Sequence, residues 1–219
     1  MKYPNFNEEK KLWRKGYKVV AGLDEAGRGP LAASVVAAAI TINPKGARQG
    51  GRVVGGLESK CQMPKINDSK KLSPKKREEF YKILTEHPQI KWGIGKVSEK
   101  VIDKINILEA TKLAMEKAVK NLSDRTNFRQ VDFLILDGNF KNKTEIPQKP
   151  IIKADEKVFS CAAASIIAKV TRDRMMLRYH KKYPQYGFDK HKGYPTELHR
   201  KMLRKYGFCK IHRKSFKVS

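Results

Sequence analysis

The chain has 219 residues, which suits one large domain, and 40% of them are hydrophobic, enough to bury a sizeable core. Its formal net charge of +26 indicates a polyanionic partner, because binding phosphates releases the cations condensed around them. The sequence lacks the ~18-residue apolar run of a membrane helix, the apolar core of a secretory signal and the cysteine spacing of a disulfide framework or zinc site, so we expect a cytoplasmic protein without a membrane partner.

The first third of the chain predicts two strands and a surface excursion. Residues 17–23 and 34–42 are short, apolar and contain β-branched residues, as buried strands do, and a turn at residues 27–30 separates them. A glycine-rich stretch follows at residues 43–64 and carries few bulky apolar side chains. We expect it to lie on the surface, with a hairpin through residues 52–54.

The rest of the chain alternates between helices and strands. Ser73 followed by Pro74 is typical of a helix start, with the serine as N-cap, and Gly207 is typical of a helix stop. From these signals and from apolar periodicity we expect helices at residues 73–85, 98–122, 161–183 and 195–206, and strands at residues 90–97, 131–136 and 150–153. This order predicts one α/β domain with a helical C-terminal extension.

Four acidic residues follow apolar runs, at the predicted ends of strands: Asp24, Glu25, Asp137 and Asp155. Strand ends are where open α/β sheets present side chains to a cleft. Carboxylates gathered at one sheet edge repel one another unless cations join them, and Mg²⁺ and Mn²⁺ prefer such oxygen ligands. Two such ions can hold the attacking and leaving oxygens of a phosphodiester displacement. Alternatively, these acids are N-caps, turn formers or ion-pair partners of the abundant lysines.

Two of these acids are neighbours, and neighbours project to opposite faces of a regular strand. For Asp24 and Glu25 both to reach one metal site, the chain must leave extended geometry there, and Gly27 and Gly29 allow such a bend. The segment formed by Gly27, Arg28 and Gly29 either serves a ligand through its backbone N–H groups or makes a tight turn into the next strand.

Two further segments are candidates for contact with a nucleic acid. Lys70 and Lys71 precede the predicted helix start and form either a phosphate clamp beside a helix N-terminus or an ordinary solvated loop. Between residues 182 and 194, aromatic residues alternate with basic ones, which suits stacking on nucleotides, although such rings are as often packing anchors. The five histidines show no metal-binding spacing, so we assign them no metal.

Half of the net charge lies in the last quarter of the chain. Residues 169–219 hold 16 lysines and arginines against three acidic residues. This distribution favours a phosphate-facing surface. The alternative is a general basic bias, in which lysines cover solvated faces.

Several motifs, taken together, resemble the ordered signature of bacterial ribonuclease HII. They are GLDEAGRGPLA at residues 22–32, DSKKLS at 68–73, LDGN at 136–139, KAD at 153–155, AAASIIAKVTRD at 162–173, HKGYPT at 191–196 and IHRKSF at 211–216. The resemblance covers residues 17–216, nearly the whole chain. The related ribonuclease HIII carries an extra N-terminal domain, and because only about 16 residues precede the first predicted strand here, HII is favoured.

The resemblance implies a ribonuclease H-like fold, in which helices flank a mixed central sheet. It implies a single catalytic domain over residues 1–219, with the ribonuclease H-like core at about 17–183 and a basic helical region at about 184–219. Two departures stand in the motifs: Ala33-Ser34 where the family usually has Gly-Pro, and Ala154 where it often has Gly. Neither removes a functional group.

The resemblance also implies an acidic tetrad that is both catalytic and metal-binding, with two divalent ions, Mg²⁺ or Mn²⁺. Asp173 is an alternative fourth acid. We prefer Asp155 because it matches the acid of the family's Lys-Gly-Asp block, whereas Asp173 can pair with Arg172, Arg174 or the DSKK lysines. The tetrad then falls on Asp24, Glu25, Asp137 and Asp155.

Substrate contacts follow from the same resemblance. Gly27, Arg28 and Gly29 correspond to the family's reader of the ribose 2′-hydroxyl, the group that separates RNA from DNA. Tyr194 corresponds to the tyrosine that senses the RNA–DNA junction, and Lys70 and Lys71 lie in the DSKK motif.

The implied activity is that of a monomeric endonuclease with two substrates. It hydrolyses the RNA strand of RNA–DNA hybrids, and it cuts at ribonucleotides embedded in duplex DNA, leaving 5′-phosphate and 3′-hydroxyl ends. The alternatives are a non-catalytic nucleic-acid-binding protein and a different metal nuclease of related fold. Four acids facing phosphates would cost a pure binder affinity, which favours a nuclease.

Overall fold

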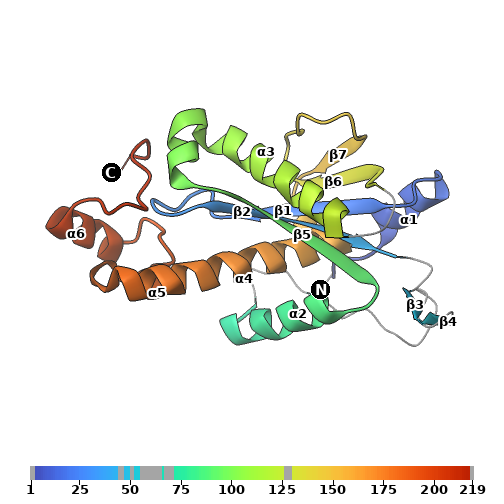
Figure 1. The fold of residues 1–219 in the computed structure, drawn as a ribbon, viewed down its shortest axis with the longest axis horizontal. Helices are drawn as coiled ribbons and strands as arrows, with labels where there is room; N and C mark the ends of the chain where they lie inside the picture. The colour runs from blue at the N-terminus through green and yellow to red at the C-terminus, as the bar shows by residue number, and fades with distance from the viewer. Residues whose placement is uncertain are drawn as a thin grey trace.

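The computed structural model describes residues 3–43, 47–49, 52–54, 66, 72–125 and 130–217. Its centre is a five-stranded sheet in the order β5-β2-β1-β6-β7 (Figure 1). The strands are β1 Val20–Ala26, β2 Val35–Ile42, β5 Ile90–Val97, β6 Phe133–Asp137 and β7 Gln148–Ile151. β2 is antiparallel to both β1 and β5, whereas β6 is parallel to both β1 and β7. The mixed central sheet that we expected is confirmed.

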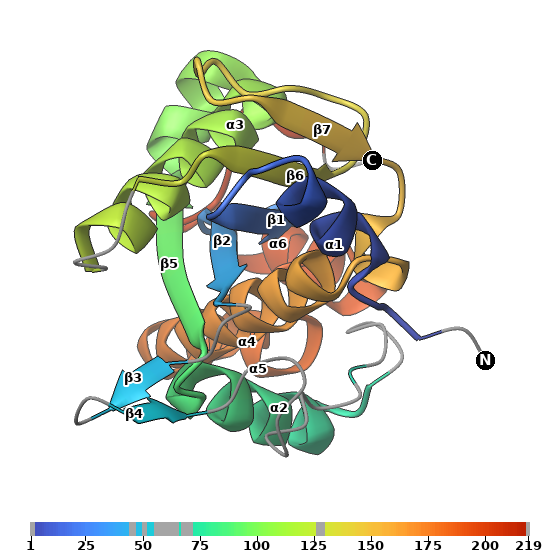
Figure 2. The ribbon, with the colours of Figure 1, turned by 90° about the vertical axis from the view of Figure 1, so that its right-hand side faces the viewer.

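Helices cover both faces of this sheet. They are α1 Asn7–Arg14, α2 Pro74–Glu86, α3 Glu99–Arg125, α4 Phe159–Lys182, α5 Phe188–His191 and α6 Glu197–Tyr206, with the short 3-10 turns η1 Ala154–Glu156 and η2 Pro184–Tyr186. α3 lies on one face, and α4 lies on the other with α2 packed beyond it (Figure 2). Within the described part of the chain, no helix combines the length and apolar character that a membrane span needs.

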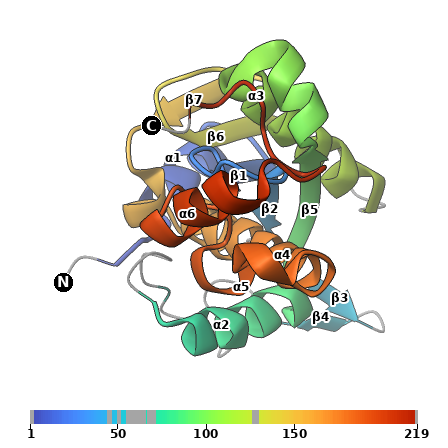
Figure 3. The same cartoon turned by 90° about the vertical axis from the view of Figure 1, so that its left-hand side faces the viewer.

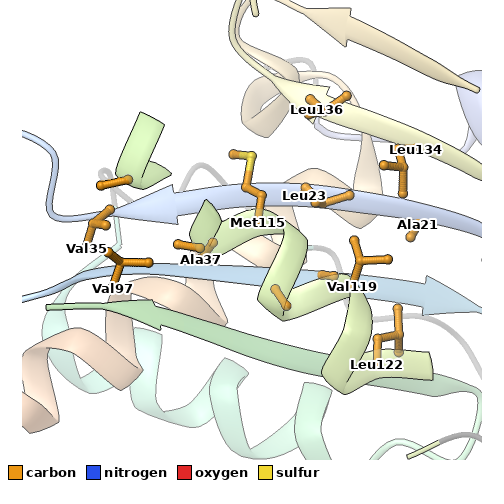
Figure 4. Packing of buried hydrophobic residues seen from close by; sticks show 14 of the residues in the cluster. Ala21, Leu23, Val35, Ala37, Val97, Met115, Val119, Leu122, Leu134 and Leu136 are labelled. Atoms are coloured by element: carbon orange, nitrogen blue, oxygen red, sulfur yellow. The ribbon is translucent and has the colours of Figure 1, made fainter. Parts of the chain in front are cut away.

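Side-chain alternation along the strands builds a core on each face. Leu23 of β1 and Ala37 of β2 pack against Met115 of α3 (Figure 4). The next residues along turn the other way, so that Ile40 of β2 belongs to the core with Ile166 of α4. Both faces of the strands are therefore buried, which is why their sequences are continuous apolar runs.

The close approach of α4 to β1 requires a glycine. A Cβ atom built on Gly22 would lie 2.2 Å from the Oγ atom of Ser160 near the start of α4. The carboxylate of Glu9, buried in α1, accepts hydrogen bonds from the backbone N–H of Ser160 at 2.9 Å and from its hydroxyl at 2.8 Å. α1, which we did not predict, thus secures the N-terminus of the helix that backs the site.

Most predicted elements are confirmed, with three corrections. The first strand begins at Val20 rather than at residue 17, and it continues through Asp24 and Glu25 to Ala26. The long helix α3 is interrupted at Asn106, whose φ of 66° is not helical. The extended piece expected at 150–153 is instead β7, which ends at residue 151.

Other expected features of the chain are present as predicted. The hairpin in the glycine-rich stretch is formed by β3 Ala47–Gln49 and β4 Arg52–Val54. Ser73 caps α2, since its side chain accepts a hydrogen bond from the N–H of Lys76. Gly207 ends α6.

The C-terminal region packs on the end of α4 and on the segment between β1 and β2 (Figure 3). Its anchors include Phe188 of α5, Leu203 of α6 and Ile211, which share a buried cluster with Leu31 and Met176. The end of the chain is therefore held against the loop that leaves β1.

Candidate active site

Two parallel strands bring the first two acids together. β1 and β6 are parallel neighbours, and Leu23 is paired with Leu136. The next residue of each strand is an aspartate, Asp24 on β1 and Asp137 on β6. Single oxygen atoms of Asp24, Asp137 and Asp155 all lie within 4.8 Å of one another. The parallel register thus creates an acidic cluster at one edge of the sheet.

The third acid of this cluster does not stand at the end of a strand, contrary to our expectation. Asp155 lies in η1, after Lys153 has turned the chain with a left-handed φ of 57°. The N–H of Ala154 donates to Asp137 Oδ1 at 2.6 Å, which ties η1 to the end of β6. This short turn brings the buried Asp155 side chain next to Asp24.

The cluster is electrostatically unfavourable without a cation. Burial raises the pKa of Asp24 well above its ordinary value, and repulsion from Glu25, Asp137 and Asp155 raises it further, against a hydrogen bond from Ser165 that lowers it. Asp24 is only 4% exposed, so water screens little of this repulsion. A hard divalent cation would relieve it, and carboxylate oxygens are the ligands that such ions prefer.

The fourth predicted acid, Glu25, is close to the cluster but is not one of its three members among the described residues. Its carboxylate is near enough to Asp24 to raise the pKa of that residue, after burial, and its Oε1 lies 3.6 Å from Arg28 Nη1. The chain leaves extended geometry at the first of the glycines that we expected to allow a bend, just after this pair. β1 stays regular through both acids, and the bend comes at Gly27, whose φ is +99°.

The alternative acid, Asp173, lies elsewhere on α4. It forms an ion pair with Lys169 at 2.8 Å, not with either of the arginines that we considered. Arg174 pairs with Glu78 of α2, and Arg172 donates hydrogen bonds to three backbone carbonyls. Asp173 is not among the three clustered acids, so the geometry favours Asp155 for that place.

Buried arginines hold the turn that follows β1. The carbonyls of Gly27 and Arg28 accept hydrogen bonds from Arg213 at 2.6 and 2.9 Å, and the carbonyl of Ala33 accepts two more. A Cβ atom on Gly27 would lie 2.1 Å from Arg172 Nε, so only glycine fits there. Ala33 itself has a φ of 68°, in the region that favours the glycine usual at that place in the family.

Tyr194 lies beside this turn. Its ring is 40% exposed, and a Cβ atom on Gly29 would lie 3.8 Å from its Cε1 atom. The two segments are joined by a hydrogen bond from the N–H of Leu31 to the carbonyl of Gly193 at 2.8 Å. Arg172 bridges them again, donating to Lys192 O at 2.9 Å and to Ala32 O on the other side. We call Gly27, Arg28, Gly29, Tyr194 and the two buried arginines, Arg172 and Arg213, the reader region.

A groove of about 380 Å³ opens next to Tyr194, between α2, α4 and residues 190–194. Five basic side chains line it: Arg77, Lys169, Arg174, Lys190 and Lys192. Lys70 and Lys71 fall outside the described residues. We considered four rings for stacking on nucleotides. Tyr186 and Phe188 are buried packing anchors, Tyr183 is half-buried, and Tyr194 is the exposed one.

Sequence reasoning missed the two arginines of the reader region. Arg172 and Arg213 are both fully buried, and burial is the main reason that the pKa of Arg213 falls to about 9, with the nearby Arg172 as the second cause. The signal for Arg172 was its place between Val170 and Met175, two buried residues of α4. Arg213 follows no periodic pattern, so only the fold reveals its role.

Known proteins of one family resemble this chain over most of its length. The family model for ribonuclease HII matches residues 21–219. The chain is similar to ribonuclease HII of Syntrophus aciditrophicus, with 48% identity over 96% of this chain and 89% of that protein, and to ribonuclease HII of Chlamydia caviae, with 49% identity over 95% and 88%. The crystal structure of ribonuclease H2 from Pyrococcus horikoshii OT3 is similar with a TM-score of 0.67 and 29% identity, covering 91% of this chain and 94% of that one.

The fold, the acidic cluster and these relatives lead to one assignment. The sheet and its flanking helices are those of the ribonuclease H-like fold. The chain belongs to the ribonuclease HII family, whose members are divalent-metal-dependent endoribonucleases that act on RNA–DNA hybrids.

Proposed function

We propose that Asp24, Asp137 and Asp155, with Glu25 beside them, hold two divalent cations, Mg²⁺ or Mn²⁺. The observation that supports this most strongly is the convergence of three carboxylates within 4.8 Å around the buried Asp24. The donor set fits the group, because it consists of hard oxygen atoms whose mutual repulsion a dication relieves.

When bound, such ions activate water and stabilise the leaving oxygen of a phosphodiester. The chain's own groups do the positioning. The hydrogen bond from Ala154 to Asp137 fixes one carboxylate, and Ser165 fixes another by bonding to Asp24. Hydrolysis with a 3′-oxygen leaving group yields 5′-phosphate and 3′-hydroxyl ends.

We further propose that the enzyme cuts at single ribonucleotides embedded in duplex DNA. The turn of Gly27, Arg28 and Gly29 reads the ribose 2′-hydroxyl, and Tyr194 senses the deoxyribose that follows. The closeness of Gly29 to Tyr194, where an added Cβ atom would lie 3.8 Å from the ring, supports this pairing, because both elements can then reach neighbouring sugars.

The basic groove and the DSKK lysines, Lys70 and Lys71, are proposed to bind the phosphate backbone. We propose that the enzyme acts as a monomer with a single catalytic domain over residues 1–219. We place this activity in the cytoplasm.

The test is cleavage of a DNA duplex that contains one ribonucleotide, labelled at the 5′ end. With Mg²⁺ or Mn²⁺ we expect one cut on the 5′ side of the ribonucleotide, a 3′-hydroxyl that a polymerase can extend, and no cut in excess chelator. An all-DNA duplex of the same sequence is the control. Undiminished cutting in chelator would overturn the metal assignment. An enzyme that cuts a continuous RNA–DNA hybrid but not this duplex would overturn the proposal that it acts at single ribonucleotides.

A further inference from the structure

Three histidines of the C-terminal region are buried beside the reader region and have no part in the chemistry described above. His199 and His212 are 0% and 2% exposed, and His191 is 8% exposed. The rings of His191 and His199 stack with centroids 4.4 Å apart. Among the described residues the candidate metal group consists of acids alone, so these rings call for a different explanation.

The partners of His199 fix its tautomer. Its Nδ1 lies 3.0 Å from the carbonyl oxygen of Tyr194. Because a carbonyl oxygen can only accept, Nδ1 carries the proton, and Nε2 of the neutral ring is left as an acceptor. That Nε2 lies 3.1 Å from Nε2 of His212, which therefore donates to it.

The second ring continues the same order. With its proton on Nε2, His212 has an acceptor at Nδ1, and the N–H of Cys209 donates to it at 2.9 Å. The result is a series of three hydrogen bonds that runs from the N–H of Cys209 through His212 and His199 to the carbonyl of Tyr194, each donor preceding its acceptor. Both histidines must be neutral, and burial lowers their pKa values to about 4.

His191 completes the frame around Tyr194. The N–H of Tyr194 donates to the carbonyl of His191 at 2.9 Å, and the N–H of Gly193 donates to His191 Nδ1 at 3.1 Å. The carbonyl of Tyr194 accepts a second bond, from the N–H of Thr196 at 2.8 Å. The backbone of Tyr194 is therefore held on both sides, whereas the residue is 40% exposed, and Lys169 Nζ and Arg172 Cζ lie no nearer than 5.9 Å from the centroid of its ring.

We propose that His199, supported by His212, is a positioning residue that orients Tyr194 for recognition of the RNA–DNA junction. This inference rests on the proposed role of Tyr194. The histidines do not touch the substrate. Their effect reaches it through one backbone carbonyl, so it must appear in the choice between substrates and not in the reaction of the acidic cluster.

Two isosteric substitutions separate positioning from simple packing. His199→Asn keeps an N–H group near the place of Nδ1, facing Tyr194, and loses the link to His212. His199→Gln keeps an acceptor near the place of Nε2, facing His212, and loses the bond to Tyr194. Both variants remove the same buried ring, so each is the folding control for the other.

The experiment measures initial rates on a single-ribonucleotide duplex and on a continuous hybrid, and compares the ratio of the two. One hydrogen bond corresponds to roughly a twofold to tenfold change. We expect His199→Gln to lower the ratio by about that factor and His199→Asn to stay within about twofold of wild type. In a Tyr194→Ala background, His199→Gln should have no further effect on the ratio. The ¹⁵N chemical shifts of the histidine rings should show a proton on Nδ1 of His199.

Different failures have different meanings. An unchanged ratio in Tyr194→Ala alone would overturn the junction role of Tyr194, and the positioning role with it. A lowered ratio in Tyr194→Ala together with equal ratios in the two His199 variants would overturn the positioning role alone. The positioning role would also be overturned if His199→Gln kept its full effect in the Tyr194→Ala background, or if Nδ1 of His199 were unprotonated.

Discussion

The acidic cluster and the reader region lie next to each other but differ in their electrostatics: like charges repel in the first, and buried polar groups are paired in the second. In the cluster, carboxylates crowd around the buried Asp24 and raise its pKa. In the reader region, two fully buried arginines donate hydrogen bonds to backbone carbonyls, and beside it one neutral histidine ring donates a hydrogen bond to another. We therefore expect the first region to require an added cation, whereas the polar groups of the second are paired within the chain.

From this difference we expect the two regions to have different roles. An unfavourable cluster of like charges gains stability when a cation binds, so it suits groups that act through a metal. A region whose polar groups are satisfied internally holds its shape before the substrate arrives, which suits discrimination between similar sugars. Changes in the cluster should therefore affect the rate of the chemistry, and changes in the reader region should affect selectivity.

The largest effect is expected in the cluster. Asp137→Asn removes one charge that a metal needs but leaves the basic surface intact, so cleavage should fall by at least ~10³-fold, equivalent to about 4 kcal/mol of transition-state stabilisation. Hybrid binding, measured by fluorescence anisotropy, should survive.

The matched control is Asp124→Asn, the same change at an exposed position of α3. It should cleave at the wild-type rate. Comparable activity in Asp137→Asn and Asp124→Asn would show that the acidic cluster takes no part in catalysis.

Stability against pH tests whether the buried histidines are neutral. Their folded pKa values of about 4 lie below the ordinary 6.5, so the unfolded chain binds more protons between these values and the native state loses stability as the pH falls through that window. We expect the free energy of unfolding to drop by about 2–4 kcal/mol between about pH 7 and about pH 5. Urea unfolding would measure it. The double variant His199→Asn/His212→Asn should show a clearly shallower drop, and an equal slope would mean that other groups cause it.

Tyr194 tests the selectivity of the reader region directly. Tyr194→Ala should lose about tenfold to a hundredfold of the rate at single ribonucleotides, because a stacking contact is worth about 1–3 kcal/mol. Tyr194→Phe keeps the ring and should be less affected. Initial rates on the single-ribonucleotide duplex decide the question, with the continuous hybrid as the comparison. Wild-type rates in Tyr194→Ala would make the ring a packing anchor only.

A smaller effect is expected from the lysines at the rim of the reader region. Lys190 and Lys192 line the basic groove next to Tyr194. Each phosphate contact contributes roughly one unit to the slope of log affinity against log salt. Replacing both by alanine should therefore flatten the slope by about 1–2 units and weaken binding to every sequence alike. Binding titrations at several salt concentrations would show it, and an unchanged slope would make these lysines ordinary surface charge.

Much of the fold was predictable from local signals. The buried strands appear as continuous apolar runs, and the helix starts carry their caps at Ser73 and Thr196. The parallel pairing of β1 and β6 was not predictable in this way, because pairing depends on contacts between segments far apart in the chain. The place of Asp155 was also missed, since a left-handed residue at Lys153 moves it from a strand end into η1.

The two regions differ in how far sequence alone reveals them. The acids stand next to apolar runs, so residue type and position marked them as candidates, and the family resemblance completed the set. Arg213 and His212 look like surface residues in a basic chain, and only tertiary packing shows that they are buried. Buried polar groups that bind the backbone leave no periodic pattern, which is why the reader region was predicted only as its turn, Gly27 to Gly29, and as Tyr194.

Thermal unfolding with and without metal tests most directly whether the acidic cluster is a cation site. In chelator, Asp24→Asn should unfold at a higher temperature than wild type, because the substitution removes charge repulsion in a buried cluster. Saturating Mn²⁺ should raise the wild-type midpoint by roughly 5–10 °C, as expected for about 2.7 kcal/mol of linked binding. Asp24→Asn should lose most of that shift. The assignment of these carboxylates to a metal centre would be contradicted if Mn²⁺ left the wild-type midpoint unchanged, or if Asp24→Asn kept the full shift.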